Sequence, residues 1–152
     1  MIKTLFAAAA ILASASYSAS SGQYALGINL GGASSKGKST GFSGLNFRVG
    51  QDESLDMIAA WDPGTIIING NYLHHVAPVL RQIPVKAIVP YVGIGVGVWM
   101  NDVSGAWLQV PLGIDFRFSV PVEAGLYIAP GIDLIPSTNM NMHFGIGVRY
   151  WL

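Results

Sequence analysis

From residue 23 onward, apolar residues recur at every second position along most of the chain, and no stretch sustains the 3.6-residue period of a helix. Branched aliphatic and aromatic residues dominate these stretches, and Gly, Pro, Asn and Asp interrupt them, as is typical of β-strands and turns. The alternation is clearest in the second half of the chain. The pattern predicts strands over residues 23–31, 42–49, 54–61, 65–73, 87–100, 107–118, 122–135 and 141–152.

In the predicted strands that carry charged residues, these residues fall on the face opposite to the apolar face. In the last strand, Phe144, Ile146 and Val148 share one face, whereas His143 and Arg149 share the other face with glycines. A soluble barrel would carry Lys and Glu scattered over a large polar face, but here that face is small and rich in glycine. An eight-stranded barrel has an interior just wide enough to be filled by side chains. The small polar face therefore fits the inside, and the bulky apolar face belongs outside.

The composition agrees with an apolar exterior. The chain has 152 residues, of which 51% are hydrophobic and 11% are charged, compared with about 25% charged residues in a typical soluble domain. Outside the N-terminal leader, no stretch has the roughly 18 uninterrupted apolar residues that a membrane helix needs. In lipid a sheet has to close, because an open edge leaves backbone N–H and C=O groups unpaired. The sequence therefore predicts an all-β fold, an eight-stranded antiparallel up-and-down transmembrane β-barrel.

The first 20 residues show the three parts of a secretory signal, namely Lys3 near the start, an apolar run over residues 5–12, and then small residues. The triplet Ala13-Ser14-Ala15 has the form that the signal peptidase accepts. A retained membrane anchor is the alternative, but the apolar run is too short to span a bilayer. We expect a cleaved signal peptide over residues 1–20 and one barrel domain over residues 21–152.

The even number of predicted strands places both termini at one end of the barrel. The external connections at the opposite end are expected to be short and to cover residues 32–41, 62–64, 101–106 and 136–140. The connections at the terminus end are expected over residues 50–53, 74–85 and 119–121. Aromatic rings near strand ends are expected at the membrane interfaces, which favour amphipathic rings, and these are Tyr24, Trp61, Tyr72, Trp99, Trp107, Tyr150 and Trp151.

Several segments resemble the small OmpA/OmpX-type outer-membrane barrels. They are Pro90-Tyr91-Val92-Gly93-Ile94-Gly95, Val110-Pro111-Leu112-Gly113-Ile114-Asp115, the strand from Glu123 to Pro130-Gly131, and the ending Gly145-Ile146-Gly147-Val148-Arg149-Tyr150-Trp151-Leu152. The resemblance implies export to the outer membrane of a Gram-negative-type bacterium, with outer-membrane lipid and lipopolysaccharide as partners. It implies no single activity, since the family includes structural anchors, adhesins and lipid-modifying enzymes.

The last predicted strand also resembles the assembly signal that the outer-membrane insertion machinery binds, which makes this machinery an expected partner. Leu152 stands where the usual terminal residue is aromatic, although Tyr150 and Trp151 keep the segment aromatic. The residues assigned to the assembly signal are Phe144, Ile146, Gly147, Val148, Tyr150 and Leu152.

Inside the predicted barrel, charged side chains are expected to form a polar network of ion pairs and hydrogen bonds, because buried charge is tolerated only when it is paired. We hypothesise that this network plugs the lumen and makes the barrel a poor pore. Its expected members are Arg48, Asp56, Asp115, Arg117, Glu123, Asp133, His143 and Arg149.

Several kinds of chemistry find no support in the sequence. Cysteine is absent and the formal net charge is zero, which argues against thiolate chemistry, a lipoprotein anchor and nucleic-acid binding. Adjacent His74 and His75 would point to opposite faces of a strand, so no metal site is expected. His143 has acidic neighbours on the polar face, but no serine partner is identifiable. The glycines around Gly95 lack the spacing of a nucleotide-binding loop, and no cofactor is expected.

The favoured hypothesis is a non-enzymatic outer-membrane barrel with a structural or surface-interaction role. The alternatives are a lipid-modifying outer-membrane enzyme, a narrow channel, and a soluble periplasmic β-barrel that binds a hydrophobic ligand. The soluble alternative would need the apolar faces turned inward. The sequence specifies no external partner.

Overall fold

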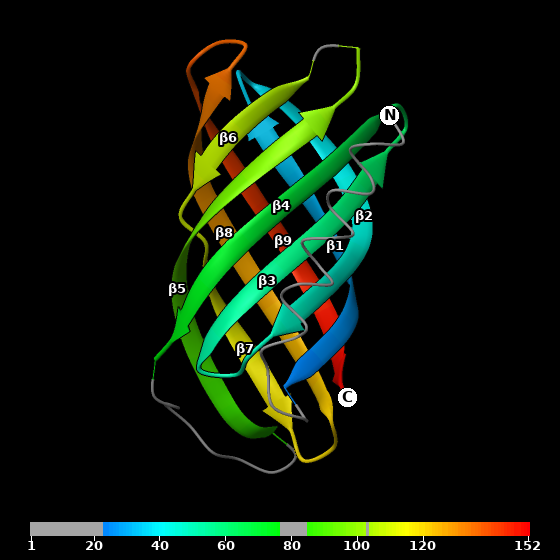
Figure 1. Cartoon of the computed structure of the whole chain (residues 1–152), viewed down its shortest axis with the longest axis vertical. Coiled ribbons are helices and arrows are strands. Elements are labelled where there is room, and N and C mark those ends of the chain that lie inside the picture. The colour runs from blue at the N-terminus through cyan, green and yellow to red at the C-terminus, as the bar shows by residue number, and fades with distance from the viewer. Residues whose placement is uncertain (1–22, 77–84, 103) are drawn as a thin grey trace.

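The computed structural model describes residues 23–76, 85–102 and 104–152, so the predicted leader over residues 1–20 lies outside the described residues. The regular structure of the described part is β-strand (Figure 1). In this part of the chain, no helix is both long enough and apolar enough to cross a membrane. The strands are β1 (Tyr24–Ser35), β2 (Lys38–Val49), β3 (Glu53–Asp62), β4 (Thr65–His75), β5 (Val85–Met100), β6 (Gly105–Gln109), β7 (Leu112–Phe118), β8 (Val122–Ile135) and β9 (Asn139–Trp151).

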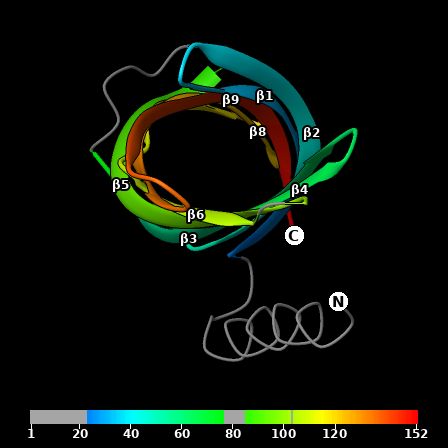
Figure 2. The same ribbon diagram turned by 90° about the horizontal axis from the view of Figure 1, so that it is seen from above.

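The strands form one antiparallel sheet that closes on itself. β1 to β5 pair in sequence order, β6 and β7 each pair with both β5 and β8, β8 pairs with β9, and the pairing of β1 with β9 completes the ring. Viewed along its axis, the ring is continuous (Figure 2). Because β6 and β7 both lie between β5 and β8, they are two parts of one barrel strand. The predicted fold, a closed eight-stranded antiparallel barrel, is confirmed.

A proline divides the strand that was predicted as one piece over residues 107–118. Proline has no backbone N–H and cannot donate to a β-ladder, and β6 ends at Gln109 just before Pro111. The carbonyl of Pro111 still accepts from Gly93 N at 2.8 Å, and Val110 N donates to the carbonyl of Pro130 at 2.9 Å. The interruption therefore keeps hydrogen bonds to both neighbouring strands.

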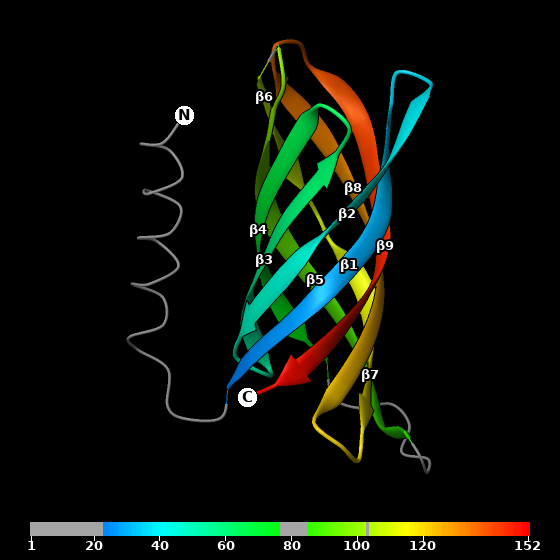
Figure 3. The ribbon, with the colours of Figure 1, turned by 90° about the vertical axis from the view of Figure 1, so that its right-hand side faces the viewer.

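Strands continue into two of the predicted connections, so the bounds predicted for these connections are wrong. β1 extends to Ser35 and β2 begins at Lys38, so most of the predicted loop over residues 32–41 is strand. The hairpin closes with Lys36 and Gly37, whose φ values of 52° and 73° suit a tight two-residue turn. Figure 3 shows this hairpin rising from the barrel wall. β4 likewise extends to His75, which was predicted in the turn over residues 74–85, and residues 77–84 of that turn lie outside the described residues.

The two ends of the barrel differ. At the terminus end lie Tyr24, Leu152 and the turns after β2 and β7, whereas the hairpin end carries the turns that follow β1, β3, β5 and β8 (Figures 1 and 3).

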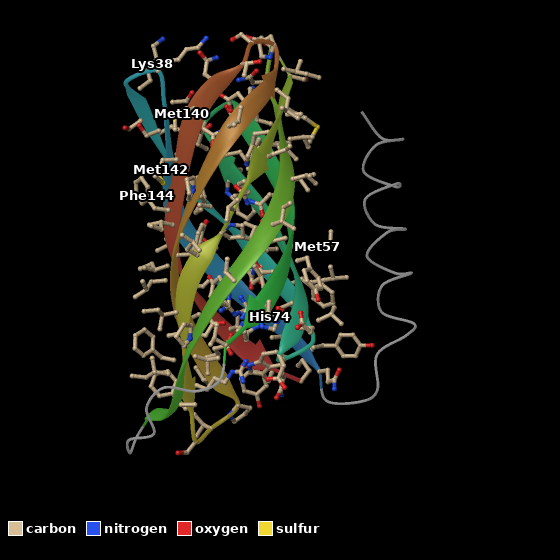
Figure 4. The ribbon with its side chains drawn as sticks, turned by 90° about the vertical axis from the view of Figure 1, so that its left-hand side faces the viewer. Lys38, Met57, His74, Met140, Met142 and Phe144 are labelled. Atoms are coloured by element: carbon tan, nitrogen blue, oxygen red, sulfur yellow. The ribbon has the colours of Figure 1, made fainter. Side chains whose placement is uncertain are left out.

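Bulky apolar side chains cover the outside of the barrel. Ile94 and Ile146 are 62% and 60% exposed, whereas Asp115 and Glu123 are fully buried. Side chains of Met57, Met142 and Phe144 project away from the wall (Figure 4). Each barrel strand contributes to this outer apolar surface, with Leu26, Ile28, Leu45, Leu55, Ile66, Ile94, Val96, Leu108, Leu112, Leu126, Ile128, Phe144, Ile146 and Val148 among the exposed residues.

The interior near the hairpin end holds an apolar cluster of Phe42, Ile58, Ala60, Ile67 and Trp107. Gly97 faces this cluster, and a Cβ atom at that position would collide with the indole ring of Trp107. The space that glycine leaves is therefore filled by an aromatic ring from the neighbouring strand.

Two of the expected interfacial aromatics are inside the barrel. Trp107 is 1% exposed and stacks on Trp99, with ring centroids 5.5 Å apart. Their assignment to the membrane interface is wrong, because both take the inward phase of their strands. Trp61, Tyr72 and Tyr150 do lie exposed on the outer surface.

Candidate functional site

The barrel interior gathers most of the buried polar side chains of the described residues, and its densest group lies near the terminus end. Two arginines cross the lumen there from β2 and β9. Arg48 Nε lies 2.9 Å from Asp56 Oδ1, and its Nη1 lies 3.0 Å from Glu123 Oε1. Arg149 donates from Nε to Glu123 Oε1 at 2.9 Å and from Nη1 to Asn46 Oδ1 at 3.3 Å.

Two fully buried carboxylates join these arginines. Asp115 on β7 accepts from Arg48 Nη1 at 2.5 Å through Oδ2 and from Arg149 Nη2 at 2.6 Å through Oδ1. Glu123 on β8 contacts both arginines and also accepts from Arg117 Nε at 3.2 Å. Each carboxylate therefore bridges at least two guanidinium groups.

Two further side chains complete the group on the terminus side. His75 Nε2 lies 3.0 Å from Asp115 Oδ2, and its Nδ1 lies 3.1 Å from the backbone carbonyl of Asp52. Arg117 Nη2 donates to the carbonyl of Gln51 at 2.7 Å. The ionic cluster is defined here as Arg48, Asp56, His75, Asp115, Arg117, Glu123 and Arg149.

The charges of the ionic cluster balance, since it contains three arginines and three carboxylates. Burial of unpaired charge is strongly unfavourable, whereas paired and hydrogen-bonded charge is tolerated. Its members come from β2, β3, β4, β7, β8 and β9. The contacts therefore tie together strands that are not neighbours in the sheet.

Glycines make room for these long side chains. A Cβ atom on Gly27 would lie 2.6 Å from Arg149 Cγ, and one on Gly125 would lie 2.5 Å from Asp115 Oδ1. Any larger residue at either position would displace a member of the ionic cluster. This steric requirement explains why the polar face of the predicted strands is rich in glycine.

The structure brings together six of the eight residues expected in the lumenal network. Asp133 and His143 also point inward, but they lie near the hairpin end, away from the ionic cluster. His75 was missed because its strand was predicted to end at Leu73. Continuing the period-two alternation of the polar residues Asn69 and Asn71 would have placed His75 on the inner face.

A layer of amides from β4 and β6 lies on the inner face of the barrel wall, toward the hairpin end from the ionic cluster. Trp107 Nε1 donates to Gln109 Oε1 at 2.7 Å, Gln109 Nε2 donates to Asn71 Oδ1 at 2.6 Å, and Asn71 Nδ2 donates to Asn69 Oδ1 at 3.2 Å. The cavity that adjoins this layer, between it and the ionic cluster, measures only about 10 Å³. That volume is about the size that one water molecule needs.

A much larger cavity of about 690 Å³ occupies the hairpin end and is called the vestibule here. Its rim includes turn residues of the hairpins, namely Lys36, Gly64, Asp102 and Ser137. Deeper in, Trp107 and His143 stack with their ring centroids 4.8 Å apart. The interior thus has a tightly filled half and an open half.

The residues expected to form the assembly signal lie along β9 and just after it. Phe144, Ile146, Val148 and Tyr150 are exposed on the outer surface. Gly147 takes the opposite, inward face of the strand. Leu152 follows the strand, and its backbone N donates to the carbonyl of Tyr24 at 2.8 Å.

Comparison with solved structures shows the same fold at low sequence identity. The chain is similar to Neisserial surface protein A (NspA), with a TM-score of 0.62 and 11% identity over 88% of this chain and 98% of that chain. It is also similar to the N-terminal β-barrel domain of Pseudomonas aeruginosa OprF, with a TM-score of 0.56 and 15% identity over 85% of this chain and 99% of that domain. The sequence matches no protein-family profile and no curated protein.

Proposed function

We propose that this chain is an exported outer-membrane barrel with a structural or surface-interaction role, from which residues 1–20 are removed as a signal peptide. The observation that carries the proposal is the apolar outer surface, which includes residues from each barrel strand while the buried charges lie inside. Soluble monomers rarely expose an apolar surface of this extent, whereas a membrane barrel needs one. The shared fold with a surface protein adds support.

The soluble alternative requires the apolar faces to line a ligand cavity. The described strands turn those faces outward, and the inner face carries the ionic cluster and the amide layer instead. The arrangement therefore favours lipid, and not a hydrophobic ligand, as the partner of the apolar residues. Lipopolysaccharide is the expected partner in the outer leaflet.

We propose that the protein is not an enzyme. A lipid-modifying barrel of the serine-hydrolase kind needs a histidine on the outer surface beside a serine. His143 points inward against Trp107. His74 is on the outside, but the side chain that it contacts is Glu53, which in turn contacts Tyr72. Neither of these partners is a serine.

The ionic cluster is proposed to close the lumen at the terminus end. Support comes from its burial, since Arg48 and Arg149 are 1% and 4% exposed, and from contacts that cross the lumen. A narrow channel would need a continuous path past these side chains. We further propose that the outward residues of β9 are the part that the insertion machinery binds during assembly.

The location is tested by expressing the full chain and separating the membranes. The protein is expected in the outer-membrane fraction, to require detergent for release, and to migrate differently on a gel before and after heating, because a closed barrel resists unfolding by detergent. A mature protein that is freely soluble without detergent would overturn the proposed location.

The proposed closure of the lumen is tested separately by measuring the ionic conductance of the barrel in planar lipid bilayers. The folded barrel is expected to give no conductance above that of a protein-free bilayer, because paired buried side chains leave no water-filled path. Insertion is verified in the same preparation by protease protection. A reproducible conductance from inserted barrel would show that the lumen is open, and it would leave the proposed location unaffected.

A further inference from the structure

The vestibule contains a buried acid, Asp133, that forms no salt bridge within the described part of the chain. Asp133 is 8% exposed and accepts hydrogen bonds from Ser35 Oγ at 3.0 Å and Asn141 Nδ2 at 2.5 Å, both of which are neutral donors. Among the described residues, no Lys, Arg or His nitrogen lies within 4.0 Å of its carboxylate oxygens. Asp56, Asp115 and Glu123, in contrast, each lie beside an arginine.

Two side chains beside Asp133 also leave polar atoms without a partner. Asn141 and His143 are each 6% exposed and line the vestibule, and Asn141 Oδ1 and His143 Nδ1 form no hydrogen bond within the described part of the chain. Buried polar atoms nearly always have a partner in native proteins. Asn141 Oδ1 and the Asp133 carboxylate are both acceptors, so the missing group is a hydrogen-bond donor, and the unpaired charge favours a cation.

The vestibule also has an apolar and aromatic wall. Ile67 and Trp99 line it, and Trp99 stacks on Trp107, which in turn stacks on His143. The faces of indole rings attract cations and also accept flat apolar groups. A volume of about 690 Å³ is within the range of sites for small molecules, roughly 300–1,000 Å³.

We propose that the vestibule binds a small organic cation, with an ammonium group against Asp133 and an apolar or aromatic body against Trp99 and Ile67. The charge on Asp133 supplies the missing ion pair, and the aromatic wall distinguishes an organic cation from a metal ion. Because the vestibule opens at the hairpin end, the ligand enters without passing the ionic cluster. On the proposed topology this entrance faces the outside of the cell.

The test uses three probes of one shape and different charge, namely 2-phenylethylamine, 2-phenylethanol and phenylacetate. Each is titrated into the folded full-length barrel in detergent, and binding is followed by calorimetry and by tryptophan fluorescence, to which Trp99 and Trp107 contribute beside Trp61 and Trp151. The amine is expected to bind at least about tenfold more tightly than the alcohol, the factor that one charge-assisted hydrogen bond supplies. Phenylacetate is expected to bind more weakly still.

Three variants assign the effect to the vestibule. Asp133→Asn keeps the shape but removes the charge, and it is expected to abolish the preference for the amine. Asp102→Asn removes an exposed carboxylate at the rim of the same cavity and is expected to preserve the preference. Trp99→Leu is expected to lower the affinity for the amine and for the alcohol by a similar factor, because both ligands lose their contact with the aromatic wall.

Gel mobility before and after heating shows whether each variant is folded. Equal affinities for the amine and the alcohol, an absence of saturable binding, or a folded Asp133→Asn variant that still prefers the amine would each overturn the proposal. If Asp133→Asn does not fold, the wild-type probe series decides the charge preference, and an unchanged amine affinity in Trp99→Leu would overturn the assignment to the vestibule.

Discussion

Replacement of Glu123 by alanine is expected to lower the free energy of unfolding by about 3–5 kcal/mol, the range for breaking a buried ion pair by removing one partner. Glu123 contacts Arg48, Arg117 and Arg149 at distances of 2.9–3.2 Å and is fully buried. Its removal leaves three guanidinium groups with only two carboxylates. The measurement is a urea titration of the barrel in lipid vesicles, followed by tryptophan fluorescence.

The matched control for this prediction is Asp102→Ala, which removes an exposed carboxylate and is expected to change the free energy by less than about 0.5 kcal/mol. Glu123→Gln keeps hydrogen-bonding capacity and is expected to fall between the two. A loss below about 1 kcal/mol for Glu123→Ala, on the scale of an ordinary surface substitution, would contradict the role of the ionic cluster in stability.

Replacement of Ile146 by arginine is expected to lower the free energy of unfolding in lipid vesicles by about 2–4 kcal/mol, the effect of a cation at the middle of the lipid-facing surface of a barrel. Ile146 is 60% exposed and lies midway along β9, paired with the exposed residues Leu30 and Leu126. If the outer surface faced water, the same substitution would be nearly neutral. The measurement is again a urea titration in vesicles.

Val120 provides the control for Ile146→Arg. It is also 60% exposed, but it lies in the turn between β7 and β8 at the terminus end. Val120→Arg is expected to change the free energy by less than about 0.5 kcal/mol. Equal effects at the two positions would show that depth along the barrel does not matter and that the middle of β9 is not in the hydrocarbon region.

The strand faces could be predicted from the sequence because large apolar residues mark every second position. The signal fails where the alternating residues are small. Residues 32–35 are Gly, Ala, Ser and Ser, so they resemble a loop, yet they continue β1 because both neighbouring strands supply hydrogen-bond partners, as in the pairing of Gly32 with Gly41 and with Phe144. The break at Pro111 was detectable, since a proline within a strand already indicates an interrupted ladder.

The site was less predictable than the fold, for a geometric reason. Alternation gives the face of a residue, but its height along the barrel depends on the stagger between neighbouring strands. Asp115 and Asp133 both point inward, yet one lies in the ionic cluster and the other in the vestibule. The aromatic wall of the vestibule forms because the side chains of Trp99 and Trp107 both point inward. Their positions near strand ends do not by themselves reveal this orientation.

The central claim, that the outer surface of the barrel lies in lipid, is tested most directly by spin labels along β9. The chain has no cysteine, so a single introduced cysteine at position 144, 146 or 148 carries the only label, and position 120 serves as the control. The labels on β9 are expected to collide readily with oxygen, which dissolves in lipid, and hardly at all with a water-soluble nickel chelate, whereas the label at position 120 shows the reverse. Free collision of the nickel chelate with labels at 144, 146 and 148 would contradict the claim.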